Sequence, residues 1–227
     1  MRSAECRWRA WVLVAVASGG TGCAMVAEPM KAMAQAVAPA TGASAPAVGA
    51  GAAVSAEAPV SPEVRRAYSE AGAALRAGRT QDAERGFRAL ALAHPELGGP
   101  PANLGLIDRQ AGKLTEAATE FEQALRLNPK QPVYLNQLGI TYRQQGQFAK
   151  AREAYQQASA LDPSYAAPVL NLGILNDLYL GDGAQALALY GRYLALTPSG
   201  DAVVAKWVAE LKNRKPAVLA VKRKEPG

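Results

Sequence analysis

A three-residue pattern that recurs every 34 or 35 positions constrains this chain more than any other feature of its sequence. In each copy an alanine is followed by an aromatic residue four positions later and by a proline eight positions beyond that. The four sets are Ala83, Phe87 and Pro95; Ala117, Phe121 and Pro129; Ala151, Tyr155 and Pro163; and Ala186, Tyr190 and Pro198. A period of this length indicates a supersecondary unit repeated along the chain.

A second set of residues marks the first half of each repeat. A leucine–glycine pair stands at Leu104–Gly105, Leu138–Gly139 and Leu172–Gly173, whereas the first repeat has Glu70–Ala71. Further glycines follow at Gly78, Gly112, Gly146 and Gly181, the last displaced by one residue. Small residues let two helices approach closely, and proline cannot continue a helix. Each repeat is therefore predicted to be a helix–turn–helix hairpin, with a first (A) and a second (B) helix.

The combined pattern of Leu-Gly, Ala, an aromatic residue and Pro resembles the tetratricopeptide repeat. The resemblance covers about 135 residues. It implies an all-α fold, a right-handed superhelical α-solenoid of four hairpins within residues 62–200, at 64–97, 98–131, 132–165 and 166–200. It also implies a binding scaffold and not an enzyme.

Residues 201–214 are predicted to form a terminal capping helix. The expected apolar face consists of Val203, Val204, Trp207, Val208 and Leu211. Stacked hairpins leave an exposed apolar side on the last one, and a terminal helix covers it. A partner anchored by Trp207 is the alternative interpretation. The basic residues at 215–227 are expected to form a disordered tail.

The first 22 residues are predicted to be a bacterial export signal. Arginines precede an apolar run at 10–17, which is too short to span a bilayer, and small residues then lead to Cys23. Gly22 before Cys23 resembles the lipoprotein signal and implies lipidation of Cys23, although Gly20 stands where that family usually has leucine. Cleavage after Ala34-Gln35-Ala36, which would release a soluble periplasmic protein, is the alternative.

Residues 23–61 are expected to carry the lipid and to act as a disordered tether, because they are rich in Ala, Pro and Gly and have no apolar period. The only other cysteine, Cys6, lies in the segment that export would remove, so no disulfide is expected. Ala24 after the cysteine implies, by the same resemblance, an anchor on the periplasmic face of the outer membrane.

The charge distribution argues against a nucleic-acid partner. The chain has a net charge of +6, but the first 22 residues hold +2 and the last 16 hold +5, which leaves the repeats close to neutral. The only histidine, His94, precedes Pro95 at the expected end of a helix. Catalytic residues, a metal, a cofactor and a small-molecule substrate are therefore not expected.

The A helices are expected to line a concave groove that binds a peptide segment. Their sixth position holds Ser69, Asn103, Gln137 and Asn171, an amide-rich row with Asn136 beside it; their ninth holds Gly72, Leu106, Ile140 and Ile174; their twelfth holds Arg109 and Arg143 in the middle repeats. Amides can hold a peptide backbone, and guanidinium groups can bind a carboxylate. A purely structural lining role for these residues is the alternative.

The sequence therefore predicts a lipid-anchored periplasmic adaptor with a protein partner in an envelope complex. Its architecture resembles the pilotin-like lipoproteins that assist type IV pilus secretins. The segments 171–181 and 205–211 are also similar to repeat proteins that accompany TonB-type systems. The alternative is a cell-wall or polysaccharide-associated envelope protein that acts through its basic tail.

Overall fold

The computed structural model describes residues 60–214, and within them it contains helices and turns and no strand. The helices are α2 (Pro62–Arg76), α3 (Thr80–Ala93), α4 (Gly99–Gln110), α5 (Leu114–Leu127), α6 (Pro132–Gln144), α7 (Phe148–Leu161), α8 (Ala166–Leu175), η1 (Asn176–Leu180), α9 (Gly183–Leu196) and α10 (Ala202–Asn213). The predicted signal peptide, Cys23, most of the tether and the basic tail lie outside the described residues.

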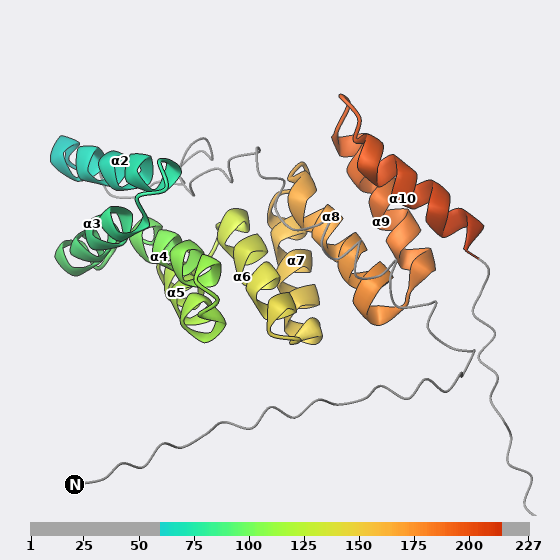
Figure 1. The fold of residues 1–227 in the computed structure, drawn as a ribbon, viewed down its shortest axis with the longest axis horizontal. Coiled ribbons are helices and arrows are strands. Elements are labelled where there is room, and N and C mark those ends of the chain that lie inside the picture. Colours follow the sequence, from blue (N-terminus) through green and yellow to red (C-terminus); the bar gives the residue numbers. More distant parts are fainter. Residues whose placement is uncertain (1–59, 215–227) are drawn as a thin grey trace, which may run out of the picture. The chain divides into compact units, whose positions relative to one another are not determined.

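Consecutive helices pair into hairpins, and each hairpin packs on the next (Figure 1). The pairs are α2 with α3, α4 with α5, α6 with α7, and α8 with α9, while α10 packs on α9. Helix α6 also contacts both α4 and α8 directly, which places these A helices on the inner side of the stack. The prediction of an all-α solenoid of four hairpins with a terminal helix is confirmed.

Glycine ends each A helix because the turn needs a left-handed residue. Gly78, Gly112 and Gly146 have φ of 74°, 77° and 75°, a region that other residues rarely adopt. The amide after Gly78 donates to the Ala74 carbonyl at 2.9 Å, which satisfies one of the last carbonyls of α2. The predicted inter-helix turns therefore lie at these glycines.

The extra residue of the fourth repeat is accommodated as a π-helical turn. Helix α8 continues into η1, and the amide of Asp182 reaches back six residues to the Asn176 carbonyl at 2.9 Å, whereas the other three turns close over five. Insertion of one residue into a helix commonly produces such a turn. The 35-residue spacing thus leaves the hairpin intact and rotates the residues of η1 relative to their counterparts.

The leucine–glycine pairs are explained by the aromatic residue of the B helix. A Cβ atom at Gly139 would lie 2.6 Å from the Tyr155 ring, and one at Gly173 would lie 2.7 Å from the Tyr190 ring. Tyr155 is 0% exposed and Tyr190 is 1% exposed. The first hairpin reverses the arrangement, since Ala71 replaces the glycine of the A helix and Gly86 lies against it on the B helix.

The Ala-aromatic-Pro pattern is explained in the same way. The four alanines are fully buried between the helices, and three of the four aromatic residues have no exposed surface. Each B helix ends two residues before its proline, and the residue between them is the C-cap, which in α3 is His94, as expected. The aromatic side chain also belongs to the core shared with the following hairpin, as Phe121 does with Tyr134 and Leu138.

The terminal helix α10 covers the last hairpin with part of the predicted face. Val204 and Leu211 are buried, and the Trp207 ring lies 5.9 Å from that of Tyr190. Asp201 caps the helix by accepting from the amides of Val203 and Val204. Val203 is 55% exposed, so its assignment to the covered face was wrong. The covered stripe is narrower than the full apolar face because α10 packs mainly on one helix, α9.

The close approach at Gly139 makes a matched test of the fold. We expect Gly139→Ala to lower the free energy of unfolding by about 1–3 kcal/mol, because the buried Tyr155 ring has no room to move. Gly191 lies in α9 with open space at its Cβ position. Gly191→Ala should therefore raise stability by about 0.5–1 kcal/mol. Urea denaturation followed by circular dichroism measures both, and equal effects would contradict the packing argument.

Candidate functional site

The amide row on the A helices is partly used to join neighbouring hairpins. Asn103 on α4 is 0% exposed, and its Nδ2 donates to the Tyr68 hydroxyl on α2 at 2.6 Å and to the Gly99 carbonyl at 2.9 Å. Tyr68 also packs edge-on against Phe87 at 5.4 Å. In this structure Asn103 therefore connects α2 to α4 from inside the stack.

A second amide pair connects α6 to α8. The half-buried Asn171 donates to Asn136 Oδ1 at 3.0 Å, and the buried Asn136 donates to the Tyr165 hydroxyl at 3.3 Å. Gln137, next to Asn136, is half-buried, and Ser69 is exposed. The predicted row is thus not a continuous ladder of free amides: Gln137, Asn171 and Ser69 keep exposed surface, and Asn103 and Asn136 face the interior.

Most residues at the ninth position of the A helices are buried in the core, and one keeps exposed surface. Leu106 is 5% exposed and Ile174 is 2% exposed, and Gly72 is buried. Ile140 is half-buried and lies against the core formed by the third and fourth hairpins. Ile140 is therefore the member of this predicted stripe that keeps some surface for a ligand.

Arg109 crosses from α4 to α6. Its Nη1 donates to the Gln137 carbonyl at 3.1 Å, and its guanidinium carbon lies 5.8 Å from the centre of the Phe121 ring. The pKa of Arg109 is lowered to about 10, mainly because burial disfavours its charge; Tyr155 opposes this shift, and the nearby charge of Arg143 adds a smaller lowering. The side chain remains protonated at neutral pH.

Arg143 occupies the corresponding position one repeat later and reaches η1. Its Nη1 donates to the Tyr179 hydroxyl at 3.4 Å, and its guanidinium carbon lies 5.7 Å from the centre of that ring. Tyr179 is 40% exposed and packs against Phe148 at 4.9 Å. The structure thus brings the two predicted arginines together on adjacent A helices, with an exposed tyrosine beside the second.

Asp177 stands at the twelfth position of the fourth repeat but does not face the arginines. It lies in η1 with its side chain 1% exposed, and it accepts from Arg214 Nη1 at 2.8 Å and from the Tyr190 hydroxyl at 3.4 Å. A buried carboxylate requires a charged partner, and Arg214 at the end of α10 provides it. This contact holds the terminal helix to the fourth hairpin.

Sequence reasoning did not identify the tyrosines that complete these contacts. Tyr68 and Asn103 are 35 residues apart, as are Asn136 and Asn171. Polar side chains that lie one repeat plus one residue apart in the sequence could therefore have predicted contacts between successive A helices. Tyr179 had no such signal, because the π-helical turn determines its position.

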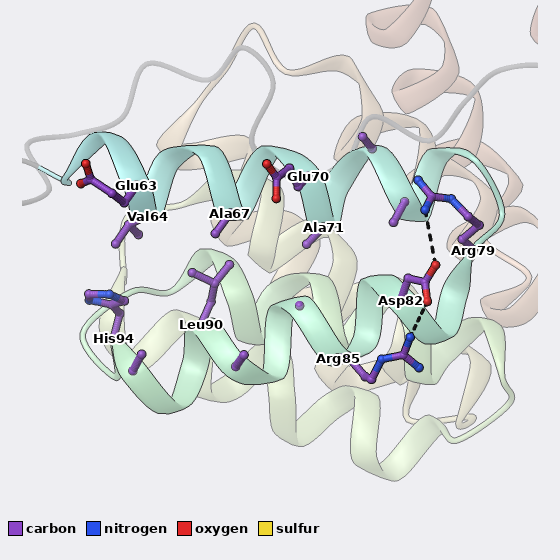
Figure 2. Close-up of a pocket in the computed structure, with 15 residues that line it drawn as sticks. Glu63, Val64, Ala67, Glu70, Ala71, Arg79, Asp82, Arg85, Leu90 and His94 are labelled. Carbon is purple, nitrogen blue, oxygen red and sulfur yellow. Dashed lines mark hydrogen bonds and ion pairs between the residues drawn. The ribbon is translucent and has the colours of Figure 1, made fainter.

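A separate open groove of about 810 Å³ runs between α2 and α3 along the first hairpin (Figure 2). Val64, Ala67 and Leu90 point into the space between these helices, and Glu70 lies at its edge. The later repeats have a buried leucine in place of Glu70, and that leucine packs against the preceding hairpin, as Leu104 does. Glu70 lies on the first hairpin of the described stack, where a charged side chain can remain in contact with water.

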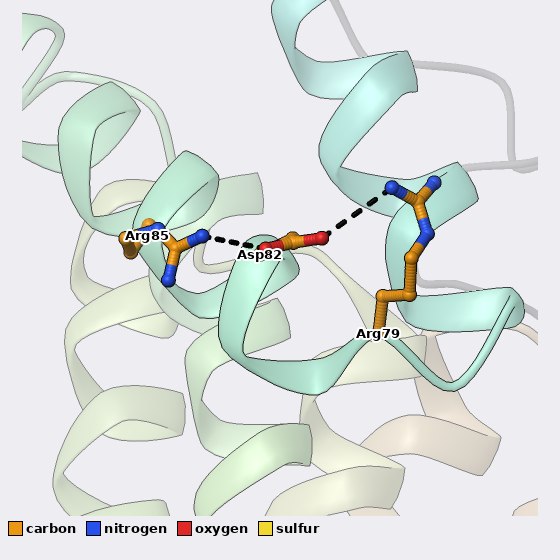
Figure 3. Close-up of polar contacts among 3 residues, drawn as sticks. All are labelled: Arg79, Asp82 and Arg85. Carbon is orange, nitrogen blue, oxygen red and sulfur yellow. Dashed lines mark hydrogen bonds and ion pairs between the residues drawn. The ribbon is translucent and has the colours of Figure 1, made fainter.

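The rim of this groove is polar and solvent-exposed. Asp82 pairs with both Arg79 and Arg85 (Figure 3). The two arginine side chains are 61% and 72% exposed, and ion pairs at such positions contribute little to stability. Within residues 60–214 there is no cluster of three or more potential metal ligands, and no helix in that range is long and apolar enough to cross a membrane.

The fold and the A-helix face define a helical-repeat solenoid. The sequence profile of the tetratricopeptide repeat family matches residues 68–132 and 136–201, and a second profile of that family matches residues 101–164. These matches cover more than half of the chain, which therefore belongs to the tetratricopeptide repeat family. Tetratricopeptide domains typically act as scaffolds for protein–protein interaction without catalysing a reaction.

Solved structures of other repeat proteins share this fold. The structure described as pilF of Pseudomonas aeruginosa is 25% identical, with a TM-score of 0.61, and the match covers 66% of this chain and 68% of that one. The MamA protein is 19% identical, with a TM-score of 0.58 and coverage of 66% and 82%. A Thermobaculum terrenum O-GlcNAc transferase mutant is 24% identical, with a TM-score of 0.55 and coverage of 58% and 26%. No curated protein matches the sequence.

The burial of Asn103 and Asn171 predicts different costs for the two amides. We expect Asn103→Ala to lower the free energy of unfolding by about 1–3 kcal/mol, because two hydrogen bonds are lost inside the stack. Asn171→Ala should cost about 0.5–1.5 kcal/mol, because water can replace its single bond. Thermal unfolding of the two variants tests this order, and a larger loss for Asn171→Ala would contradict it.

Proposed function

We propose that this protein is a lipid-anchored periplasmic adaptor that holds a segment of another envelope protein along its A-helix face. The proposal is based on hydrogen bonds between the A helices, made by side chains of successive hairpins. The Tyr68–Asn103, Arg109–Gln137 and Asn136–Asn171 contacts each join two A helices. A surface held in this way is ordered before a ligand arrives.

Such rigidity supports the binding of an extended or helical peptide segment. A preformed surface loses little conformational entropy on binding, so weak contacts spread over several repeats can add up to useful affinity. The face also offers mixed chemistry, because Gln137 and Asn171 are polar, Ile140 is apolar and Tyr179 is aromatic, and all four keep some exposed surface. This combination suits one side of a protein–peptide interface.

The envelope assignment rests on the sequence of the first 23 residues and on one structural likeness. A short apolar run before Gly22 and Cys23 is typical of a lipoprotein signal. The likeness to Pseudomonas aeruginosa pilF favours a pilus or secretin complex as the system that contains the partner. A TonB-type system is the second candidate for the same adaptor role, on the similarity of residues 171–181 and 205–211.

A bulky charge on the A-helix face should block the partner. We expect Asn171→Arg to reduce the amount of a cross-linked envelope partner by about tenfold or more, because a steric block costs more than about 1.4 kcal/mol of binding energy. The matched control is Gln156→Arg, which adds the same side chain to an exposed position of α7, a B helix. Quantitative mass spectrometry after cross-linking in cells measures both. A partner captured equally by the two variants would exclude the A-helix face as its binding site.

The lipid anchor has its own test. Cys23→Ser should move the protein from the membrane fraction to the soluble periplasmic fraction, because the cysteine is the only acyl acceptor at the expected cleavage site and a serine is not acylated. Fractionation with labelled palmitate measures location and acylation together. Membrane residence that persists without the cysteine would contradict a lipid anchor at this position and leave the A-helix proposal untouched.

A further inference from the structure

Arg109 and Arg143 are two largely buried cations without an acidic partner in the described part of the chain. None of the ion pairs within residues 60–214 includes either side chain. Both lie on the A-helix face, at equivalent positions of α4 and α6. The groups around them are a backbone carbonyl, the hydroxyls of Tyr155 and Tyr179, and two aromatic rings, and none of these carries a negative charge at neutral pH.

The absence of a counter-ion has an energetic cost. Moving a charge out of water is unfavourable unless a group of opposite charge compensates it, and two like charges in proximity add to that cost. Asp177, at the equivalent position of the fourth repeat, is bound to Arg214 and therefore does not neutralise Arg143. The A-helix face therefore has an excess of positive charge, because Asp177 is paired with Arg214.

Buried polar atoms near the arginines also lack partners. Arg143 Nε and Gln137 Oε1 are buried and make no hydrogen bond with any described residue. The Tyr155 hydroxyl lies close enough to interact electrostatically with both guanidinium groups, yet no well-formed hydrogen bond satisfies it. Of these atoms, Arg143 Nε and the Tyr155 hydroxyl can donate to an anion, whereas Gln137 Oε1 can only accept. Buried donors without partners require an explanation, and a ligand that completes the site is one.

The π-helical turn supplies a further donor at the solvent boundary. It places Tyr179 so that its ring covers the Arg143 guanidinium and its hydroxyl accepts a long, weak bond from Nη1. The hydroxyl hydrogen is not used in that bond and can be donated to an anion. Tyr179 is 40% exposed, so part of this side chain can contact a ligand from solvent.

We propose that Arg109 and Arg143, together with the Tyr179 hydroxyl, form a binding site for a carboxylate of the partner segment. This inference rests on the proposed peptide-binding function and names the group that the A-helix face recognises. Guanidinium groups match the planar, two-oxygen geometry of a carboxylate. The carboxylate comes from an Asp or Glu side chain or from the C-terminus of the partner, because both present the same group.

Titration of the full chain with three synthetic peptides tests the site. One blocked Gly/Ser heptapeptide contains a single Asp, a matched one contains Asn in its place, and the third has no acidic side chain but a free C-terminus. The Nε–Hε resonances of Arg109 and Arg143, assigned from the Arg109→Lys and Arg143→Lys variants, report binding directly. We expect saturable shifts with at least one carboxylate peptide and none with the Asn peptide; which carboxylate peptide binds identifies the source.

Matched variants separate a specific site from general charge attraction. Arg143→Gln should weaken carboxylate binding by about tenfold or more, because a charge-assisted hydrogen-bond pair is lost. Arg126→Gln removes the same charge from an exposed position of α5 and should leave binding unchanged. Arg143→Lys retains the charge without the forked geometry and should bind with intermediate strength. Circular dichroism confirms folding of each variant.

Three results would overturn the inference: no saturable shift with either carboxylate peptide, equal shifts with the Asn peptide, or equal weakening by Arg126→Gln and Arg143→Gln. Failure of this inference differs from failure of the proposed function. If Asn171→Arg blocks the partner in cells while Arg143→Gln does not, the A-helix face binds a segment without a carboxylate in this site. If Asn171→Arg has no effect either, the peptide-binding proposal itself fails.

Discussion

The contact between a glycine of one helix and an aromatic ring of its partner supports the rest of this structure. At Gly139 and Gly173 the missing side chain lets a tyrosine ring lie directly on the A-helix backbone. That contact sets the separation of the two helices in the second, third and fourth hairpins. Phe121 and Tyr155 also share a hydrophobic core with residues of the next hairpin, so the spacing within one hairpin also affects how the following one stacks. Each repeat thus depends on its neighbours for a complete core.

The stacking of hairpins explains why the A helices both bind each other and present a surface. Helix α6 contacts α4 and α8, and polar side chains such as Asn103 and Arg109 cross between them. These residues make the face rigid at the expense of their own exposure. Fewer polar side chains therefore remain accessible on this face. Its charge is unbalanced at Arg109 and Arg143, which have no acidic partner in the described part of the chain.

The fourth repeat shows how one additional residue changes a surface without changing the fold. The π-helical turn absorbs the insertion, and the last hairpin keeps its packing around Tyr190. Within the turn, Asp177 is directed to Arg214 and Tyr179 to Arg143. The insertion therefore ties the terminal helix to the last hairpin and places an exposed aromatic side chain on the A-helix face.

The repeat pattern was sufficient to predict the hairpins, their turns and the terminal helix, because each signature residue has a local physical reason. Glycine at the turns needs positive φ, proline stops a helix, and alanine with glycine permits close packing. The side-chain roles on the A helices were not predictable in the same way. Asn103 and Gln137 stand at the same position of their repeats, yet Asn103 is buried against Tyr68 while Gln137 keeps exposed surface.

Sequence by itself thus determined the architecture of this protein, since periodicity expresses contacts that every repeat makes. Tertiary structure alone decided which polar residues join the hairpins and which remain accessible. It also decided that Asp177 pairs with Arg214 and not with Arg109 or Arg143. The contacts and the exposure of these residues depend on side chains about one repeat apart in sequence and on the rotation introduced by a single inserted residue. A pattern based on position within the repeat does not contain that information.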